Sequence, residues 1–88
     1  MRQAGKKPIL AAQIRAARAL LHWSAEELAE HSSVSLRTIR RAELPHQERK
    51  MTVSNELSIR RALENAGVEF IDENGGGPGV RLKAKPKP

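Results

Sequence analysis

The sequence contains no cysteine and only two aromatic residues among its 88 positions. Without cysteine, neither a disulfide nor a thiolate metal site can supplement the core. The two aromatic residues, Trp23 and Phe70, are too few for a surface that stacks several single-stranded bases. The core must therefore consist mainly of Leu, Ile, Val and Ala. A domain of this size buries only about 60% of its unfolded surface, so we expect a thin stability margin.

The sequence also lacks long apolar runs and a recognisable catalytic set. No apolar stretch reaches the roughly 18 residues of a membrane span, and the basic N-terminus lacks the features of a signal peptide. We therefore expect a cytoplasmic protein without a membrane partner. Three scattered histidines (His22, His31 and His46) do not suggest a metal site. The GGGPG run at 75–79 lacks the Lys-Ser/Thr of a phosphate-binding loop, so we expect neither an enzyme nor a cofactor.

Positive charge is in excess, with 16 Lys and Arg against 10 Asp and Glu, a net charge of +6. Such an excess favours a polyanionic partner, because binding releases counterions. DNA, RNA and an anionic membrane surface all satisfy this condition, and charge alone does not choose among them.

Helical periodicity dominates the first two thirds of the chain. Apolar residues at 10, 14, 17 and 21 form one stripe, which predicts a helix from Pro8 to about His22, where we expect a positive φ. The capping box of Ser24 and Glu27 predicts a short helix over residues 25–32. Ser35 can cap a third helix that runs to about residue 44, before a proline.

A fourth helix is predicted to start at Thr52 or Ser54 and to reach Ala66, with positions 59, 63 and 66 on its apolar stripe. Leu57 lies off this stripe, and Gly67 stands where a helix-terminating glycine belongs. Residues 68–71 and 80–83 are β-prone runs around a glycine-rich loop, which predicts a hairpin. The expected fold is mainly α: four helices and a short C-terminal β-hairpin over 9–83, between a flexible basic arm (1–8) and a disordered basic tail (84–88).

The third helix carries the sharpest functional signal. With a rotation of about 100° per residue, Arg40, Arg37 and Arg41 lie at about 40°, 100° and 140° from Leu36, opposite Ile39. A solvated face usually mixes charges, whereas this arc is entirely positive and repels itself. An anionic surface against it would remove the repulsion, so we favour DNA binding. The three residues 32–34 between the second and third helices suit a helix-turn-helix.

Residues 13–43, QIRAARALLHWSAEELAEHSSVSLRTIRRAE, resemble the lambda-repressor-like (Cro-type, xenobiotic-response-element) helix-turn-helix of bacterial and phage regulators. Residues 60–83 resemble the ending of a subgroup of short members, so the resemblance covers about residues 9–83. It implies a lambda-repressor-like fold and groove-facing positions at Ser35, Leu36, Arg37 and Arg41, with Arg40 on phosphate. It also implies a partly buried structural ion pair between Arg18 and Glu43.

The sequence departs from the family pattern at two positions. Ser33 stands where the family usually has a glycine with positive φ, and Ala25 stands where many members have a phosphate-anchoring glutamine. Because alanine offers no side-chain donor, the phosphate contacts would come from other cations. The candidates are Arg15, Arg40, Arg49, Lys50 and the basic ends of the chain.

The expected function is that of a transcriptional regulator, most simply a repressor, which binds double-stranded DNA as a homodimer. Hairpin residues could form the dimer contact through Val68, Phe70, Val80 and Leu82, because open strand edges attract partners. Alternatively, the hairpin folds back on the first and fourth helices of its own chain. A different class of function also stays open: an antitoxin-like module whose main partner is another protein, with DNA binding secondary.

Overall fold

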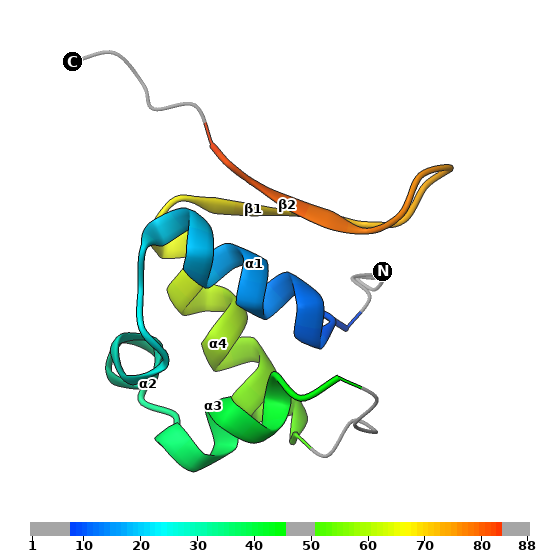
Figure 1. Ribbon diagram of the computed structural model, residues 1–88. Coiled ribbons are helices and arrows are strands. Elements are labelled where there is room, and N and C mark those ends of the chain that lie inside the picture. Colours follow the sequence, from blue (N-terminus) through cyan, green and yellow to red (C-terminus); the bar gives the residue numbers. More distant parts are fainter. Residues whose placement is uncertain (1–7, 46–50, 84–88) are drawn as a thin grey trace, which may run out of the picture.

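A computed structural model describes residues 8–45 and 51–83 (Figure 1). Within them the chain forms four helices followed by an antiparallel two-stranded hairpin, as the sequence predicted. The predicted tail and all but the last residue of the predicted arm lie outside the described residues. The elements are α1 (Ala11–Leu21), α2 (Ala25–Ser32), α3 (Leu36–Ala42), α4 (Val53–Asn65), β1 (Val68–Ile71) and β2 (Gly79–Leu82). No helix in the described segments is long and apolar enough to cross a membrane.

Side-chain caps fix where α2, α3 and α4 begin. The Ser24 hydroxyl accepts a hydrogen bond from the Glu27 backbone N–H at 3.0 Å, and the Glu27 carboxylate accepts one from Ser24 N–H at 2.7 Å. The Ser35 hydroxyl likewise accepts from the Thr38 N–H at 3.1 Å, and Thr52 caps α4 in the same way. These bonds satisfy N–H groups that a helix leaves unpaired in its first turn. The predicted starts of α2 and α3 are confirmed, and of the two starts predicted for the fourth helix, Thr52 is the one observed.

The first helix begins at Ala11, later than the predicted start at Pro8. Leu10 is its extended N-cap, with a side chain that is 42% exposed, so the expected apolar stripe is wrong at this position. The buried residue is instead Ile9, whose N–H donates to the Glu56 carboxylate at 2.7 Å. The Gln13 side chain accepts from Leu10 N–H at 2.8 Å and so takes the place of a conventional cap.

Three helix ends use a left-handed or positive-φ residue. His22 has φ 58°, Ser33 has φ 60° and Gly67 has φ 113°. The first value confirms the expectation for the end of α1, and the third confirms a glycine just beyond α4. Ser33 adopts the conformation that the family resemblance assigns to glycine, although its Cβ makes this conformation costly. The sharp change of direction between α2 and α3 therefore persists without glycine.

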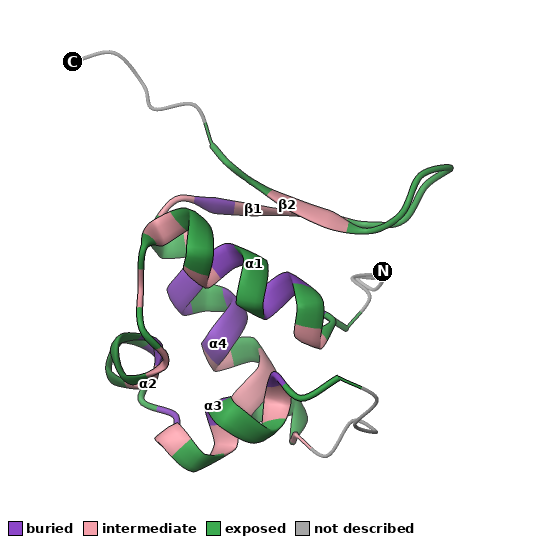
Figure 2. Cartoon of the chain, viewed as in Figure 1, coloured by how far each residue is buried: buried purple, intermediate pink, exposed green. Residues whose placement is uncertain are grey.

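The core lies where the helices face one another, as the purple segments in Figure 2 indicate. On α4, the buried apolar residues are Ile59, Ala62 and Leu63, whereas Ala66, predicted to complete this stripe, is exposed. The prediction is wrong for Ala66 because the helix ends at Asn65, so Ala66 no longer follows the helical stripe. The largest side chains that are fully buried are Ile9, Ile14, Leu28, Ile39, Ile59, Leu63 and Val68.

The hairpin packs on its own chain. Val68 pairs with Leu82 and Phe70 with Val80, so these four side chains share one face of the sheet. That face meets α1 and α4: Val68 is fully buried, and Phe70 and Val80 pack against the core. The hairpin thus lies as the fold-back alternative expects, and Val68 has no exposed surface in this arrangement. The dimer contact itself stays a prediction. Phe70 and Val80 are partly buried, and Leu82 is 49% exposed.

Candidate nucleic-acid interface

The outward side of α3 carries three exposed arginines, Arg37, Arg40 and Arg41. Ile39 on the opposite side is fully buried, and Ala42 packs against the core. The helical rotation of about 100° per residue explains this division, because the arginines occupy one arc and the apolar residues another. The predicted positive arc therefore faces solvent. In Figure 1, α3 and the hairpin lie on opposite sides of α1, so the arc is remote from the hairpin.

The two other predicted groove residues stand at the start of this arc. Ser35 is exposed, but its hydroxyl is engaged: it accepts from Thr38 N–H and contacts Thr38 Oγ1 at 3.0 Å. Leu36 is half-buried. Ser35 thus defines the beginning of α3, and Leu36 presents only part of its side chain to a ligand.

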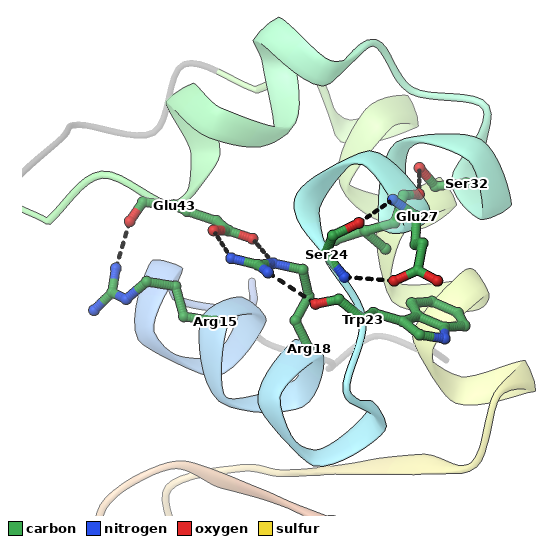
Figure 3. Close-up of polar contacts among 8 residues, drawn as sticks. Arg15, Arg18, Trp23, Ser24, Glu27, Ser32 and Glu43 are labelled. Atoms are coloured by element: carbon green, nitrogen blue, oxygen red, sulfur yellow. Dashed lines mark hydrogen bonds and ion pairs between the residues drawn. The ribbon is translucent and has the colours of Figure 1, made fainter.

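The end of α3 is attached to α1 by an ion pair. Arg18 Nε donates to Glu43 Oε2 at 2.6 Å, and its Nη2 donates to Oε1 at 2.7 Å (Figure 3). The side chains of Arg18 and Glu43 are only 21% and 10% exposed. The hydrogen bonds that Arg18 donates to Glu43 raise the pKa of Arg18 further above its ordinary value, against the opposing effect of burial. The resemblance implied this pair, and the structure brings the two residues together in bidentate geometry.

Two further contacts, which the sequence did not reveal, complete this attachment. Arg15 Nη1 donates to the backbone oxygen of Glu43, and Arg18 Nη1 donates to the backbone oxygen of Trp23 at 2.9 Å (Figure 3). Arg15 was a candidate phosphate contact, but its guanidinium group reaches the end of α3. Cations at this position interact favourably with the negative end of the helix dipole. We call Arg15, Arg18 and Glu43 the α1–α3 clamp.

The α2–α3 turn is held by a buried hydroxyl. Ser32 Oγ donates to the Leu28 backbone oxygen at 2.7 Å and accepts from Val34 N–H at 3.3 Å. Trp23 is partly buried against the core and also stacks on His31, with ring centroids 4.2 Å apart and planes 7° from parallel. This stack links the residue before the N-cap of α2 to the last turn of α2. Both contacts fix the position of α2 and hence the direction in which α3 leaves it.

A second ion pair lies on the outer surface. Arg40 Nη2 is 3.2 Å from Glu26 Oε2, and the two side chains are 61% and 62% exposed. Arg37 and Arg41 form no ion pair within residues 8–45 and 51–83. Sequence reasoning missed the Glu26 contact, because it depends on how α2 and α3 pack. Two other candidate phosphate contacts, Arg49 and Lys50, lie outside the described residues.

In comparisons with known proteins, no family model and no curated protein matches the chain. In the described part of the chain, no three His, Asp or Glu side chains gather where they could hold a metal ion. The candidate site therefore rests on the arginine arc of α3 and the contacts that hold α3.

Proposed function

We propose that this protein is a sequence-specific DNA-binding transcriptional regulator of the lambda-repressor-like helix-turn-helix type, and that it acts as a repressor. One observation carries the proposal: α3 exposes only arginine along one arc while its opposite side is anchored in the core. A short helix held in this way can enter the major groove as a rigid unit. The three residues between α2 and α3 are 33–35, one position later than predicted. This short turn and the resemblance of residues 13–43 support the same interpretation.

In this proposal, Arg37 and Arg41 read bases. A guanidinium group can donate two hydrogen bonds to guanine O6 and N7, which is worth about 1–3 kcal/mol of discrimination. Arg40 faces the DNA backbone, and Leu36 offers apolar contact to a thymine methyl group. Ser35, whose hydroxyl caps α3, contributes through its place at the end of the helix nearest the bases. The α1–α3 clamp keeps this set in a fixed orientation.

A seven-residue helix offers few contacts, so the proposal includes a homodimer that occupies two half-sites. The hairpin is an unsuitable dimer contact, because its apolar face is occupied by α1 and α4. A contact through its outer face would put the two α3 helices at opposite ends of the dimer, since α3 lies across α1 from the hairpin (Figure 1). The proposed dimer therefore uses a surface nearer α3.

The test is selection of bound duplexes from a random DNA pool, followed by affinity measurements on the enriched sequence. Arg37→Ala and Arg41→Ala are the informative variants, because both side chains are exposed and neither forms an ion pair in the described residues. Arg81→Ala serves as the control, because it removes an exposed arginine from the hairpin, on the far side of α1.

The proposal expects an enriched palindrome whose selection is relaxed by both α3 variants and unchanged by the hairpin control. Loss of one bidentate contact should weaken binding to the selected sequence about 5- to 150-fold, equivalent to about 1–3 kcal/mol. Uniform, salt-sensitive binding without an enriched sequence would contradict the proposal. The helix pair would then be a scaffold, and a protein partner would be the next candidate.

A further inference from the structure

The outer ion pair brings a negative charge into the proposed DNA-binding surface. Glu26 belongs to the first turn of α2, and its carboxylate lies 3.2 Å from the guanidinium group of Arg40. Both side chains are more than half exposed. Because Arg40 belongs to the arginine arc, the pair lies on the surface that the proposed function assigns to DNA. Its location makes it part of the proposed interface.

The surroundings of Glu26 strengthen this effect. Glu30 follows one turn later on the same side of α2, and Glu27 is also exposed. Among these three acidic residues, Glu27 is engaged in the capping box, whereas Glu26 is the one that reaches an arginine of α3. An acidic side of α2 therefore borders the arginine arc. A DNA phosphate that approached Arg40 would meet the carboxylate of Glu26 as well.

Resting on the proposed function, we infer that Glu26 limits DNA affinity by holding Arg40 in an intramolecular pair. Arg40 cannot donate fully to a phosphate while it donates to this carboxylate. When the arginine does turn to DNA, Glu26 is left unpaired beside a phosphate. Arg37 and Arg41 have no such competitor among the described residues, so they are available for base contacts. Glu26 thus weakens the sequence-independent attraction to DNA phosphates more than it weakens the base-specific contacts.

The experiment measures binding of Glu26→Gln to a labelled mixed-sequence duplex across a range of salt concentrations. Glutamine removes the charge and nearly keeps the size of the side chain. We expect binding about two- to fivefold tighter, the range that an exposed ion pair worth up to about 1 kcal/mol allows. The slope of log affinity against log salt concentration should also become steeper by about 0.9, because one more phosphate is neutralised.

Two control variants remove the same charge elsewhere. Glu30→Gln removes a neighbouring carboxylate that forms no ion pair with Arg40, and Glu69→Gln releases Arg81 on the hairpin in the way that Glu26→Gln releases Arg40. Both should have smaller effects on affinity and leave the salt slope nearly unchanged. Equal effects from all three would overturn the inference, since net charge alone would explain them.

Arg40→Gln tests whether Glu26 acts through this arginine. The loss of affinity on Arg40→Gln should be small in the unchanged protein and several-fold larger in the Glu26→Gln background. Equal losses in both backgrounds would overturn the inference while DNA binding itself stands. If neither the unchanged protein nor Glu26→Gln binds duplex DNA at low salt, the proposed function fails and the inference fails with it.

Discussion

Two ion pairs attach to α3 from different directions, and they differ in almost every physical respect. The pair of Arg18 and Glu43 is mostly buried and bidentate, and it shares the clamp with Arg15. The pair of Glu26 and Arg40 is exposed and has a single contact at 3.2 Å. The same type of ion pair therefore has two roles. The inner pair, Arg18 and Glu43, fixes α3 on the domain, whereas the outer pair, Glu26 and Arg40, changes the charge that α3 presents. Burial decides which role prevails.

Removal of the inner carboxylate should have the largest effect. Glu43→Ala leaves the Arg18 guanidinium group without its counter-charge at a site that is only 21% exposed. We expect a loss of about 3 kcal/mol in the free energy of unfolding, measured by urea denaturation followed by circular dichroism. For a domain this small, such a loss is a large part of the total.

The double variant Arg18→Met, Glu43→Leu is the matched control. It removes both charges and fills the site with apolar atoms, so it should recover much of the lost stability. A loss below about 1 kcal/mol in Glu43→Ala, similar to an exposed pair, would contradict the distinction between the inner and outer pairs.

The turn that leads into α3 offers a second test of how the domain holds this helix. Ser33 has φ 60°, a conformation that costs a residue with a Cβ about 1–2 kcal/mol. Ser33→Gly should raise the free energy of unfolding by about 1 kcal/mol after the greater flexibility of glycine in the unfolded chain is subtracted. Ser33→Ala retains the Cβ and should show no gain. Equal stabilisation by both substitutions would mean that the hydroxyl, not the backbone conformation, is unfavourable.

The outer pair should contribute little to stability. Glu26→Gln should lower the free energy of unfolding by about 0.5 kcal/mol or less, because both side chains are more than half exposed and water screens their attraction. The same urea denaturation that measures Glu43→Ala gives the comparison. A loss as large as that of the inner pair would show that Glu26 positions α3, and would remove the basis for treating the outer pair as a modulator of surface charge.

What the sequence predicted, and what it did not, follows the range of the interactions involved. Ser24, Ser35 and Thr52 cap helices through contacts within three residues, so the helix starts at 25, 36 and 53 could be read locally. The start of α1 could not, because Ile9 is fixed by Glu56, 47 residues away. Leu10 was consequently assigned a place in the core that Ile9 occupies.

The features of the candidate site divide in the same way, into those set within one helix and those set by contacts between helices. Rotation along a single helix was enough to predict that Arg37, Arg40 and Arg41 share an exposed arc. The partner of Arg40 was not predictable, since Glu26 lies on another helix and the contact depends on the geometry of the α2–α3 turn. Arg15 is similar: its spacing gives no hint that it reaches the end of α3. Contacts between elements require a packing arrangement that periodicity does not specify.

The smallest expected effect concerns the exposed pair of Glu69 and Arg81 on the hairpin, which tests how a surface pair behaves away from α3. Hydrogen bonding from Arg81 lowers the pKa of Glu69 below its ordinary value of 4.5. Because the folded pKa is lowered, the pair stabilises the hairpin above the unfolded pKa, and this contribution disappears as the pH falls through the folded pKa.

Carboxyl NMR should find Glu69 titrating below 4.5, and Arg81→Gln should return it toward that value. The helical circular dichroism signal at neutral pH should be the same in Arg81→Gln and in the unchanged protein, because the pair joins only the two strands. A pKa of Glu69 that is the same with and without Arg81 would mean that exposed pairs here have no fixed geometry, and the contact between Glu26 and Arg40 would then need direct proof in solution.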